Sequence, residues 1–179
     1  MATNKITSGK ALVGSLQATN DLIVADDAAI GGELTHKKPV IDTGGAYATP
    51  IVLTEAQSGS TILVDAAAGL DFTLPAIAAA QIGTFFRFLV TVTITSNNFR
   101  VTAGTGDLLN GALPIFDFDT ADTVSYFAPD GSDDLVLTCN GTTKGGKAGS
   151  WVEFIATGAN QWTVSGNLFG DGSLATPFS

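Results

Sequence analysis

From Val40 onward the chain is divided into short apolar runs, and this feature most constrains how it can fold. Gly, Asn, Asp and Ser separate successive runs, as turn residues do between strands. Thr, Val and Ile, whose branched side chains favour strands, make up about a quarter of the chain. One stretch, 75–81, has a helical composition and is long enough for about two turns. The sequence therefore predicts an all-β protein: an antiparallel β-sandwich, a jelly roll or a small barrel.

The run at 85–95 has the clearest strand pattern. Apolar and mostly polar residues alternate along it, which predicts a strand with one buried face. The side chains expected on that face are Phe86, Phe88, Val90, Val92 and Ile94. Asn97 and Asn98 then interrupt the run, and alternation resumes at 99–103. We therefore expect the two runs to pair as a hairpin.

The other candidate strands are shorter. They are 50–54, 61–65, 71–74, 115–118, 123–128, 135–139, 151–157 and 162–166. The last two are expected to form a second hairpin and to bring Phe154 and Trp162 into the core. Asn-Gly or Asp-Gly pairs at 110–111, 130–131, 140–141 and 171–172 predict turns, because these residues tolerate a positive φ.

The first 35 residues have a different character, with apolar pairs separated by Gly and polar positions. Strands this short need partners to be stable, so the segment cannot form a core alone. We predict an extended N-terminal arm at 1–38 and a β domain at 39–179, with His36 and Pro39 in the hinge between them. The candidate contact residues of the arm are Leu12, Leu16, Leu22, Ile23, Ile30 and Leu34.

The charge distribution disfavours a nucleic acid or a membrane as partner. The chain has 17 acidic and 8 basic residues, for a net charge of −9. Between Pro39 and Thr143 the only basic residues are Arg87 and Arg100. Neutralising phosphates or anionic lipids requires clustered Lys and Arg. We therefore predict that the protein binds neither nucleic acid nor membranes.

The sequence also lacks signs of export and of cysteine chemistry. The N-terminus is polar, without the apolar core of a secretory signal, and no apolar run approaches the ~20 residues that span a bilayer. We therefore expect synthesis in a cytoplasm without export. Cys139 is the single cysteine, which excludes an intrachain disulfide and a zinc site built on cysteines.

Two acidic stretches are candidate cation sites. Asp117 and Asp119 lie two positions apart, so on a strand both carboxylates would project from one face, with Phe118 turned inward. Ca²⁺ needs about six to eight oxygen ligands, and the spacing does not match an EF-hand loop. We therefore predict a solvated acidic face here, a turn at 130–134, and no bound metal.

Paired carboxylates can also hydrolyse glycosides, which makes Asp117, Asp119 and Asp122 candidates for a polysaccharide depolymerase. Such enzymes need a long groove lined with aromatic residues, whereas the Phe residues here fall mostly on inward strand positions. A serine hydrolase would need a Gly-x-Ser-x-Gly elbow, which is absent, and the sole histidine, His36, lies in the hinge. We predict no catalytic residues, no enzyme activity and no cofactor.

Several motifs resemble those of tailed-phage virion proteins. Residues 70–75 contain a Thr-Leu-Pro element that opens the domain in that group, before Gly83 and the Phe-rich run. Asn97–Val101 and the Asn-Gly pair at 110–111 are similar to its central hairpin and the turn after it. The closing Asn-x-Trp-x-Val-x-Gly strand is matched at 160–166. In the arm, 14–16 and 31–35 resemble the Gly-Leu repeats that precede trimeric β domains of capsid decoration proteins and fibres.

The resemblance implies a non-enzymatic homotrimer on the virion. The expected function is that of a capsid decoration, or cement, protein that stabilises the outer surface of the shell, with the major capsid protein as partner. Two alternatives remain: a short head or tail fibre or baseplate protein that binds a host surface glycan, and a polysaccharide depolymerase. The arm is short for a fibre shaft, because an extended chain rises only about 3.3 Å per residue.

Overall fold

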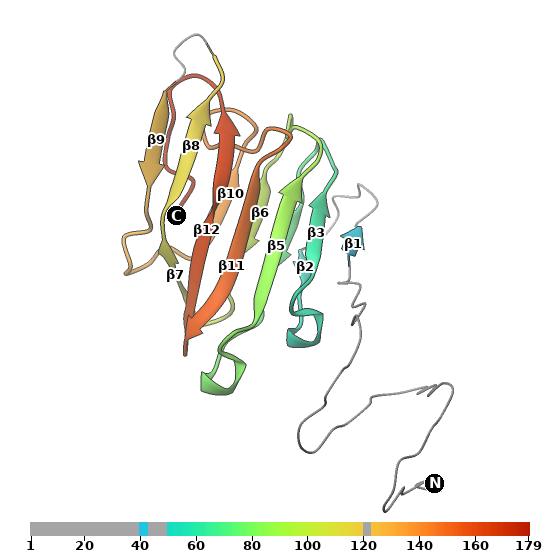
Figure 1. Ribbon diagram of the computed structural model, residues 1–179, viewed down its shortest axis with the longest axis vertical. Helices are drawn as coiled ribbons and strands as arrows, with labels where there is room; N and C mark the ends of the chain where they lie inside the picture. Colours follow the sequence, from blue (N-terminus) through green and yellow to red (C-terminus); the bar gives the residue numbers. More distant parts are fainter. Residues whose placement is uncertain (1–39, 43–49, 120–122) are drawn as a thin grey trace, which may run out of the picture. The chain divides into compact units, whose positions relative to one another are not determined.

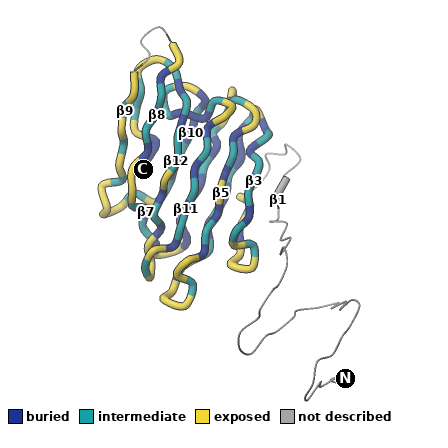
Figure 2. The backbone as a smooth tube through the Cα atoms, in the orientation of Figure 1, coloured by how far each residue is buried: buried dark blue, intermediate teal, exposed yellow. Residues whose placement is uncertain are grey.

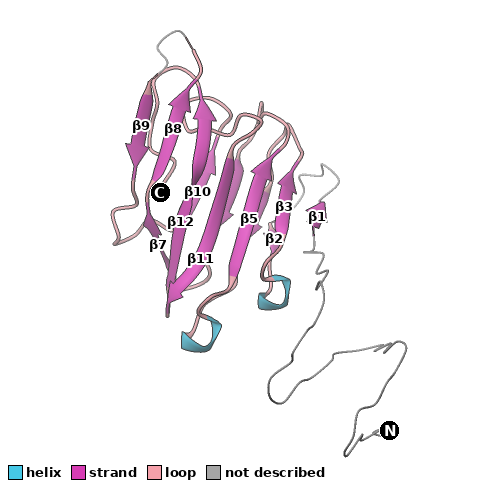
Figure 3. Ribbon diagram, viewed as in Figure 1, coloured by secondary structure: helices cyan, strands magenta, loops and turns pink. Residues whose placement is uncertain are grey.

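The computed structural model describes residues 40–42, 50–119 and 123–179 (Figure 1). Within them the regular structure is almost entirely β, which confirms the predicted fold class (Figure 3). The strands are β1 (Val40–Asp42), β2 (Ile51–Val52), β3 (Thr61–Val64), β4 (Asp71–Thr73), β5 (Phe85–Val90), β6 (Phe99–Thr102), β7 (Leu108–Gly111), β8 (Leu113–Asp117), β9 (Val124–Phe127), β10 (Val136–Cys139), β11 (Trp151–Gly158) and β12 (Gln161–Gly170). The stretch expected to be helical contributes one 3-10 turn, Ala79–Gln81, and a second lies at Glu55–Gln57.

The strands divide between two sheets. The larger has the order β1-β3-β5-β11-β12-β8-β9, and β7 also pairs with β12. The smaller has the order β10-β6-β4-β2. In Figure 1 the small sheet lies behind the large one.

Both sheets are mixed, so the prediction of an antiparallel architecture is wrong. In the first half of the domain the chain alternates between the sheets. As a result β1, β3 and β5 run parallel in the large sheet, and β2, β4 and β6 run parallel in the small one. Antiparallel pairs join β11 to β5 and β12, β8 to β9, and β10 to β6. Each early strand therefore pairs with the strand two places away in sequence.

This alternation also overturns the hairpin expected from 85–95 and 99–103, because β5 and β6 lie in different sheets. Residues 91–98, which join β5 to β6, lie against residues 65–70, which join β3 to β4. Both segments cross from the large sheet to the small one, and we call them the crossing segments. The backbone N–H groups of Thr91 and Thr95 donate to the carbonyl oxygens of Val64 and Ala67, over 3.0 and 2.7 Å. The second predicted hairpin is confirmed by β11 and β12.

Two glycines allow the backbone to approach this closely. Gly69 has a φ of +80°, and a Cβ there would lie 2.3 Å from the backbone oxygen of Asn98 in the stacked crossing. Gly111 has a φ of +108°, and a Cβ there would lie 2.2 Å from the backbone oxygen of Val164. The Asn-Gly pair at 110–111, predicted as a turn, is therefore the end of β7, where glycine lets two strands meet.

The core lies between the inner faces of the two sheets (Figure 2). Phe88 of the large sheet lies at its centre. Its ring centroid is 5.0 Å from that of Phe72 and 5.6 Å from that of Phe99, both in the small sheet, and 5.8 Å from that of Phe154. Edge-to-face and tilted rings at such distances add to the gain from burial alone.

The predicted core residues are confirmed with one exception. The buried ones are Phe86, Phe88, Val90, Ile94, Phe154 and Trp162. Val92 is 40% exposed, because β5 ends at Val90 and the strand alternation does not continue into the crossing segment.

Candidate functional site: the outer face of the large sheet

The outer face of the large sheet carries an unusual number of apolar side chains. Alternation along β5 and β11 places six side chains there in three cross-strand pairs: Leu89 with Trp151, Arg87 with Glu153, and Phe85 with Ile155. Four of these six are apolar. The next strand, β3, continues the same face with Thr61 and Leu63.

A charged pair lies in the middle of this apolar surface. The Arg87 guanidinium donates from Nε and one terminal nitrogen to a single Glu153 oxygen, over 3.0 and 2.7 Å. It also lies 5.5 Å from the centroid of the Trp151 ring, in a cation–π arrangement. The Arg87 side chain is 52% exposed despite these contacts. The pair fixes the position of the guanidinium and leaves the centre of the face without net charge.

An open hollow of about 400 Å³ lies beside this pair. It is lined by Thr61, Arg87, Leu89 and Trp151, which come from β3, β5 and β11. Leu89 and Trp151 give it apolar walls, while the Thr61 hydroxyl and the Arg87 guanidinium supply polar groups. We call this feature the Trp151 hollow.

A second apolar group lies at the opposite lateral side of the same face, on β8, β9 and the end of β12. The Phe169 ring is stacked on Phe118 at 4.7 Å and lies 5.8 Å from Phe116. Val124 and Tyr126 of β9 pair in register with Phe116 and Pro114, so they project to the same side. We call this set the β9 cluster; its members are Phe116, Phe118, Val124, Tyr126 and Phe169.

The β9 cluster contradicts the expected orientation of the acidic stretch. Phe118 was expected inside, but it is 57% exposed, while Asp117 is buried. The parallel pairing of β8 with β12 sets this orientation, because it places Phe116 beside Phe169 on the outer face and turns the next residue inward.

The small sheet differs sharply in its outer face. Its outward residues are mainly polar: Asp71, Thr73, Arg100, Thr102 and Thr138. The nearest charged atoms of Arg100 and Asp71 are 3.6 Å apart. Such alternation, apolar inside and polar outside, is typical of a sheet with one face in water. In the large sheet, by contrast, the outward residues of β5, β11, β8 and β9 are mostly apolar, and those of β12 between them are polar: Thr163, Ser165 and Asn167.

The sequence contains a signal for the outward apolar residues of β5 and β11. The run Phe85–Val90 is apolar at every position except Arg87, and Trp151–Ala156 is apolar at every position except Glu153. Near-continuous apolar runs are typical of strands buried on both faces. The alternation at 85–95 predicts only one buried face, and Leu89 is the residue that departs from it.

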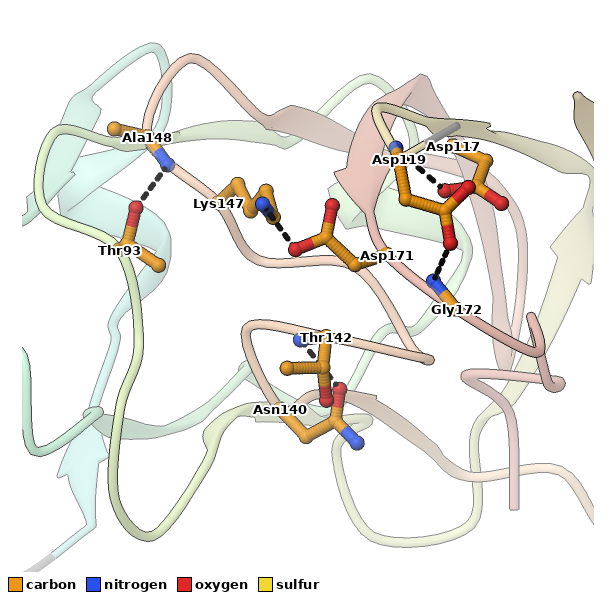
Figure 4. Close-up of polar contacts among 9 residues, drawn as sticks. All are labelled: Thr93, Asp117, Asp119, Asn140, Thr142, Lys147, Ala148, Asp171 and Gly172. Atoms are coloured by element: carbon orange, nitrogen blue, oxygen red, sulfur yellow. Dashed lines mark hydrogen bonds and ion pairs between the residues drawn. The ribbon is translucent and has the colours of Figure 1, made fainter. Parts of the chain in front are cut away.

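The acidic residues proposed as cation or depolymerase candidates have structural contacts in the loops at one end of the domain (Figure 4). An Asp117 oxygen accepts from the backbone N–H of Asp119 over 3.0 Å, and an Asp119 oxygen accepts from the backbone N–H of Gly172 over 3.2 Å. Lys147 forms an ion pair with Asp171 in the same region. Asp122 lies outside the described residues. Over the described part of the chain, no group of three or more His, Cys, Asp or Glu side chains is placed to hold a metal ion.

The acidic segment at 130–134 forms the predicted turn. Asp130 Oδ1 accepts from the backbone N–H of Ser132 over 2.8 Å and from its hydroxyl over 2.9 Å. These bonds, with a further one from the backbone of Asp133, hold the pKa of the Asp130 carboxyl below its usual value.

Cys139 is enclosed in the core at the end of β10. Burial raises the pKa of its thiol to about 12, partly offset by the charge of Lys144. The thiol is therefore protonated at neutral pH and is a poor nucleophile.

The six candidate contact residues of the arm, Leu12, Leu16, Leu22, Ile23, Ile30 and Leu34, lie outside the described residues, as does the hinge at His36. Their role stays a prediction. No helix in the described ranges is both long and apolar enough to span a membrane. Comparisons with protein-family models, curated proteins and solved structures found no match.

Proposed function

We propose that the protein is a non-enzymatic structural subunit that assembles as a homotrimer and decorates the outer surface of a tailed-phage capsid. The observation that carries this proposal is the set of apolar side chains on the outer face of the large sheet, on β5 and β11 and in the β9 cluster, in contrast to the mainly polar outer face of the small sheet. Exposed apolar patches of this kind mark sites of association. Closed symmetry among identical copies is the commonest way for a soluble protein to bury such a face.

The capsid location rests on the motifs that resemble virion proteins. In this proposal the arm attaches the trimer to the major capsid protein through its six apolar candidate residues. Three arms on one trimer act together, so a modest affinity per arm gives firm attachment through effective concentration. The charge distribution favours this division of roles, because the acidic excess lies between Pro39 and Thr143 rather than in the arm.

The contacts of the acidic residues support a structural role over a depolymerase. Asp117 is buried, and both Asp117 and Asp119 accept hydrogen bonds from backbone amides that fix the loops around them. In a glycosidase the two carboxylates would flank a substrate groove.

A second candidate function is a short head or tail fibre or a baseplate component that binds a host surface glycan. The Trp151 hollow is the observation that favours it, since an aromatic ring beside polar groups suits a sugar. In that case the hollow would face solvent in the assembled particle.

Cryo-electron microscopy of the assembled virion tests the proposal and separates the two candidates. Decoration predicts three-fold density for this protein on the capsid shell, across the junctions between capsomers. Density at the tail, or on a fibre that projects from the head, would contradict decoration and favour the second candidate.

A further inference from the structure

We propose that Tyr126 of one copy of the chain inserts into the Trp151 hollow of a second copy, so that the trimer closes head to tail. This inference rests on the proposed homotrimer and adds which surfaces meet in it. Its two elements are the most exposed apolar side chain of the β9 cluster and the hollow on the same face.

Tyr126 and the hollow lie on the same outer face but at different lateral positions. The hollow is formed over β3, β5 and β11, whereas Tyr126 lies on β9, the edge strand of the described sheet. From β5 to β9 there are four strand spacings of about 4.8 Å, which add up to ~19 Å across the sheet. A chain therefore cannot fill its own hollow. In the proposed contact, the β9 edge of each copy lies against the β3–β5–β11 side of the next copy, so two different patches meet. Such a contact forms a ring of three copies when each copy is rotated by a third of a turn relative to the one before it.

The chemistry of the two surfaces is complementary. Tyr126 is 76% exposed, the largest value among the exposed large apolar side chains. Its ring would lie against Leu89 and Trp151, and its hydroxyl could bond to the Arg87 guanidinium or to the Thr61 hydroxyl. Val124, which is also exposed, precedes Tyr126 on the same face of β9, and Pro114 lies opposite Tyr126 on β8; both would help to shield the contact from water, as the surroundings of an interface hot spot do.

Charge favours the same pairing. Exposed carboxylates lie before and after β9, at Asp119 and Asp130. The hollow presents the positive end of the neutral Arg87–Glu153 pair, because the Arg87 side chain is 52% exposed and that of Glu153 only 15%. Approach of the β9 edge to the hollow therefore brings negative flanks toward a positive group, which guides the register of the contact.

Cross-linking of the full chain tests the proposed contact. We would combine Tyr126→Cys with Leu89→Cys and treat the protein with a short bis-maleimide whose reach is less than the ~19 Å between β5 and β9. The native Cys139 does not interfere, because it is buried and its thiol is protonated. The controls are each single variant and the pair Val52→Cys with Leu89→Cys. Val52 is 65% exposed, but it lies on β2, at the edge of the small sheet.

Covalent trimers from the Tyr126–Leu89 double variant, with monomers from every control, would support the proposal. Dimers from Leu89→Cys alone would overturn it in favour of a face-to-face contact. A protein that sediments as a trimer but does not cross-link would also overturn it, leaving the homotrimer intact and the hollow covered by the arm or by a saccharide. A protein that sediments as a monomer would overturn both this inference and the proposed homotrimer.

A truncation provides an independent readout. Tyr126→Ala should raise the dissociation constant of the trimer by about tenfold or more, the effect of removing an interface hot spot. Val52→Ala, which removes an exposed apolar side chain elsewhere, should leave the constant unchanged. Equal effects of the two changes in sedimentation equilibrium would contradict the proposed contact.

Discussion

The indole Nε1 of Trp162 donates a hydrogen bond to Oδ2 of Asp107 over 3.1 Å, and both residues are fully buried. The same oxygen accepts from the backbone N–H of Ile77 over 3.0 Å. Asp107 therefore joins β12 to the loop after β4 and to the start of β7. The other Asp107 oxygen has no hydrogen-bond partner among the described residues.

Asp107→Ala should lower the free energy of unfolding by about 2 to 5 kcal/mol, because it leaves two buried donors unpaired. Trp162→Phe removes one of these donors together with its hydrogen bond, so it leaves no donor unpaired. The penalty for unpaired polar groups should therefore be larger in Asp107→Ala than in Trp162→Phe. Urea unfolding measures both variants. Asp133→Ala, at an exposed position, is the control and should fall within about 0.5 kcal/mol of wild type. A loss under about 1 kcal/mol for Asp107→Ala would contradict this role.

Phe88→Ala should destabilise the domain by about 3 to 5 kcal/mol, because the residue is fully buried against aromatic rings of both sheets. Phe118→Ala is the matched control, since that ring is mostly exposed and should cost far less in the monomer. Chemical denaturation of both variants gives the comparison. Similar losses would mean that Phe88 does not lie at the centre of the core.

Gly69→Ala should destabilise the domain much more than Gly106→Ala. Both glycines have a positive φ, +80° and +85°, so a Cβ strains the two backbones to a similar degree. A Cβ at Gly106 would meet nothing within 4 Å, whereas at Gly69 it would meet the backbone of Asn98 at 2.3 Å. The difference between the two variants in thermal unfolding isolates the cost of separating the stacked crossings. Equal melting temperatures would contradict the stacking.

The Cys139 thiol should make stability depend on pH in alkaline solution. Its pKa is about 12 in the folded protein and 9.0 in its ordinary state, so the unfolded chain releases this proton first as the pH rises. The thiol's contribution is complete below pH 9 and is lost as the pH approaches 12. The free energy of unfolding, measured as a function of pH, should therefore fall more steeply for wild type than for Cys139→Ala. Parallel curves for the two proteins would contradict the burial of the thiol.

The strand positions were largely predictable from sequence, but strand partners were not. Alternation in the run that starts at Phe85 locates a strand and its inner face, because both are local properties of the chain. Whether the chain after Val90 turns back or crosses to the other sheet depends on contacts with the 65–70 crossing, which is distant in sequence. For the same reason an Asn-Gly pair such as 110–111 indicates backbone freedom without showing whether it is used in a turn or in a close strand approach.

The candidate site was less predictable than the fold. The arm residues, from Leu12 to Leu34, are predicted as contacts only because they are apolar residues in a segment too short to form its own core, and they lie outside the described residues. The outer face was readable in principle from the near-continuous apolar runs that contain Leu89 and Trp151. The hollow and the β9 cluster could not be predicted from the sequence. Each is formed by side chains of several strands that are neighbours in the sheet but distant from one another in sequence.

The proposed trimer buries the apolar side chains on the outer face of the large sheet between copies of the protein. Sedimentation velocity of the full chain and of Leu89→Lys tests it most directly, with Thr73→Lys, on the outer face of the small sheet, as the matched control. We expect trimers of the 18.2 kDa chain for wild type and Thr73→Lys, and folded monomers for Leu89→Lys. A monomeric wild type, or a Leu89→Lys variant that remains trimeric, would contradict it.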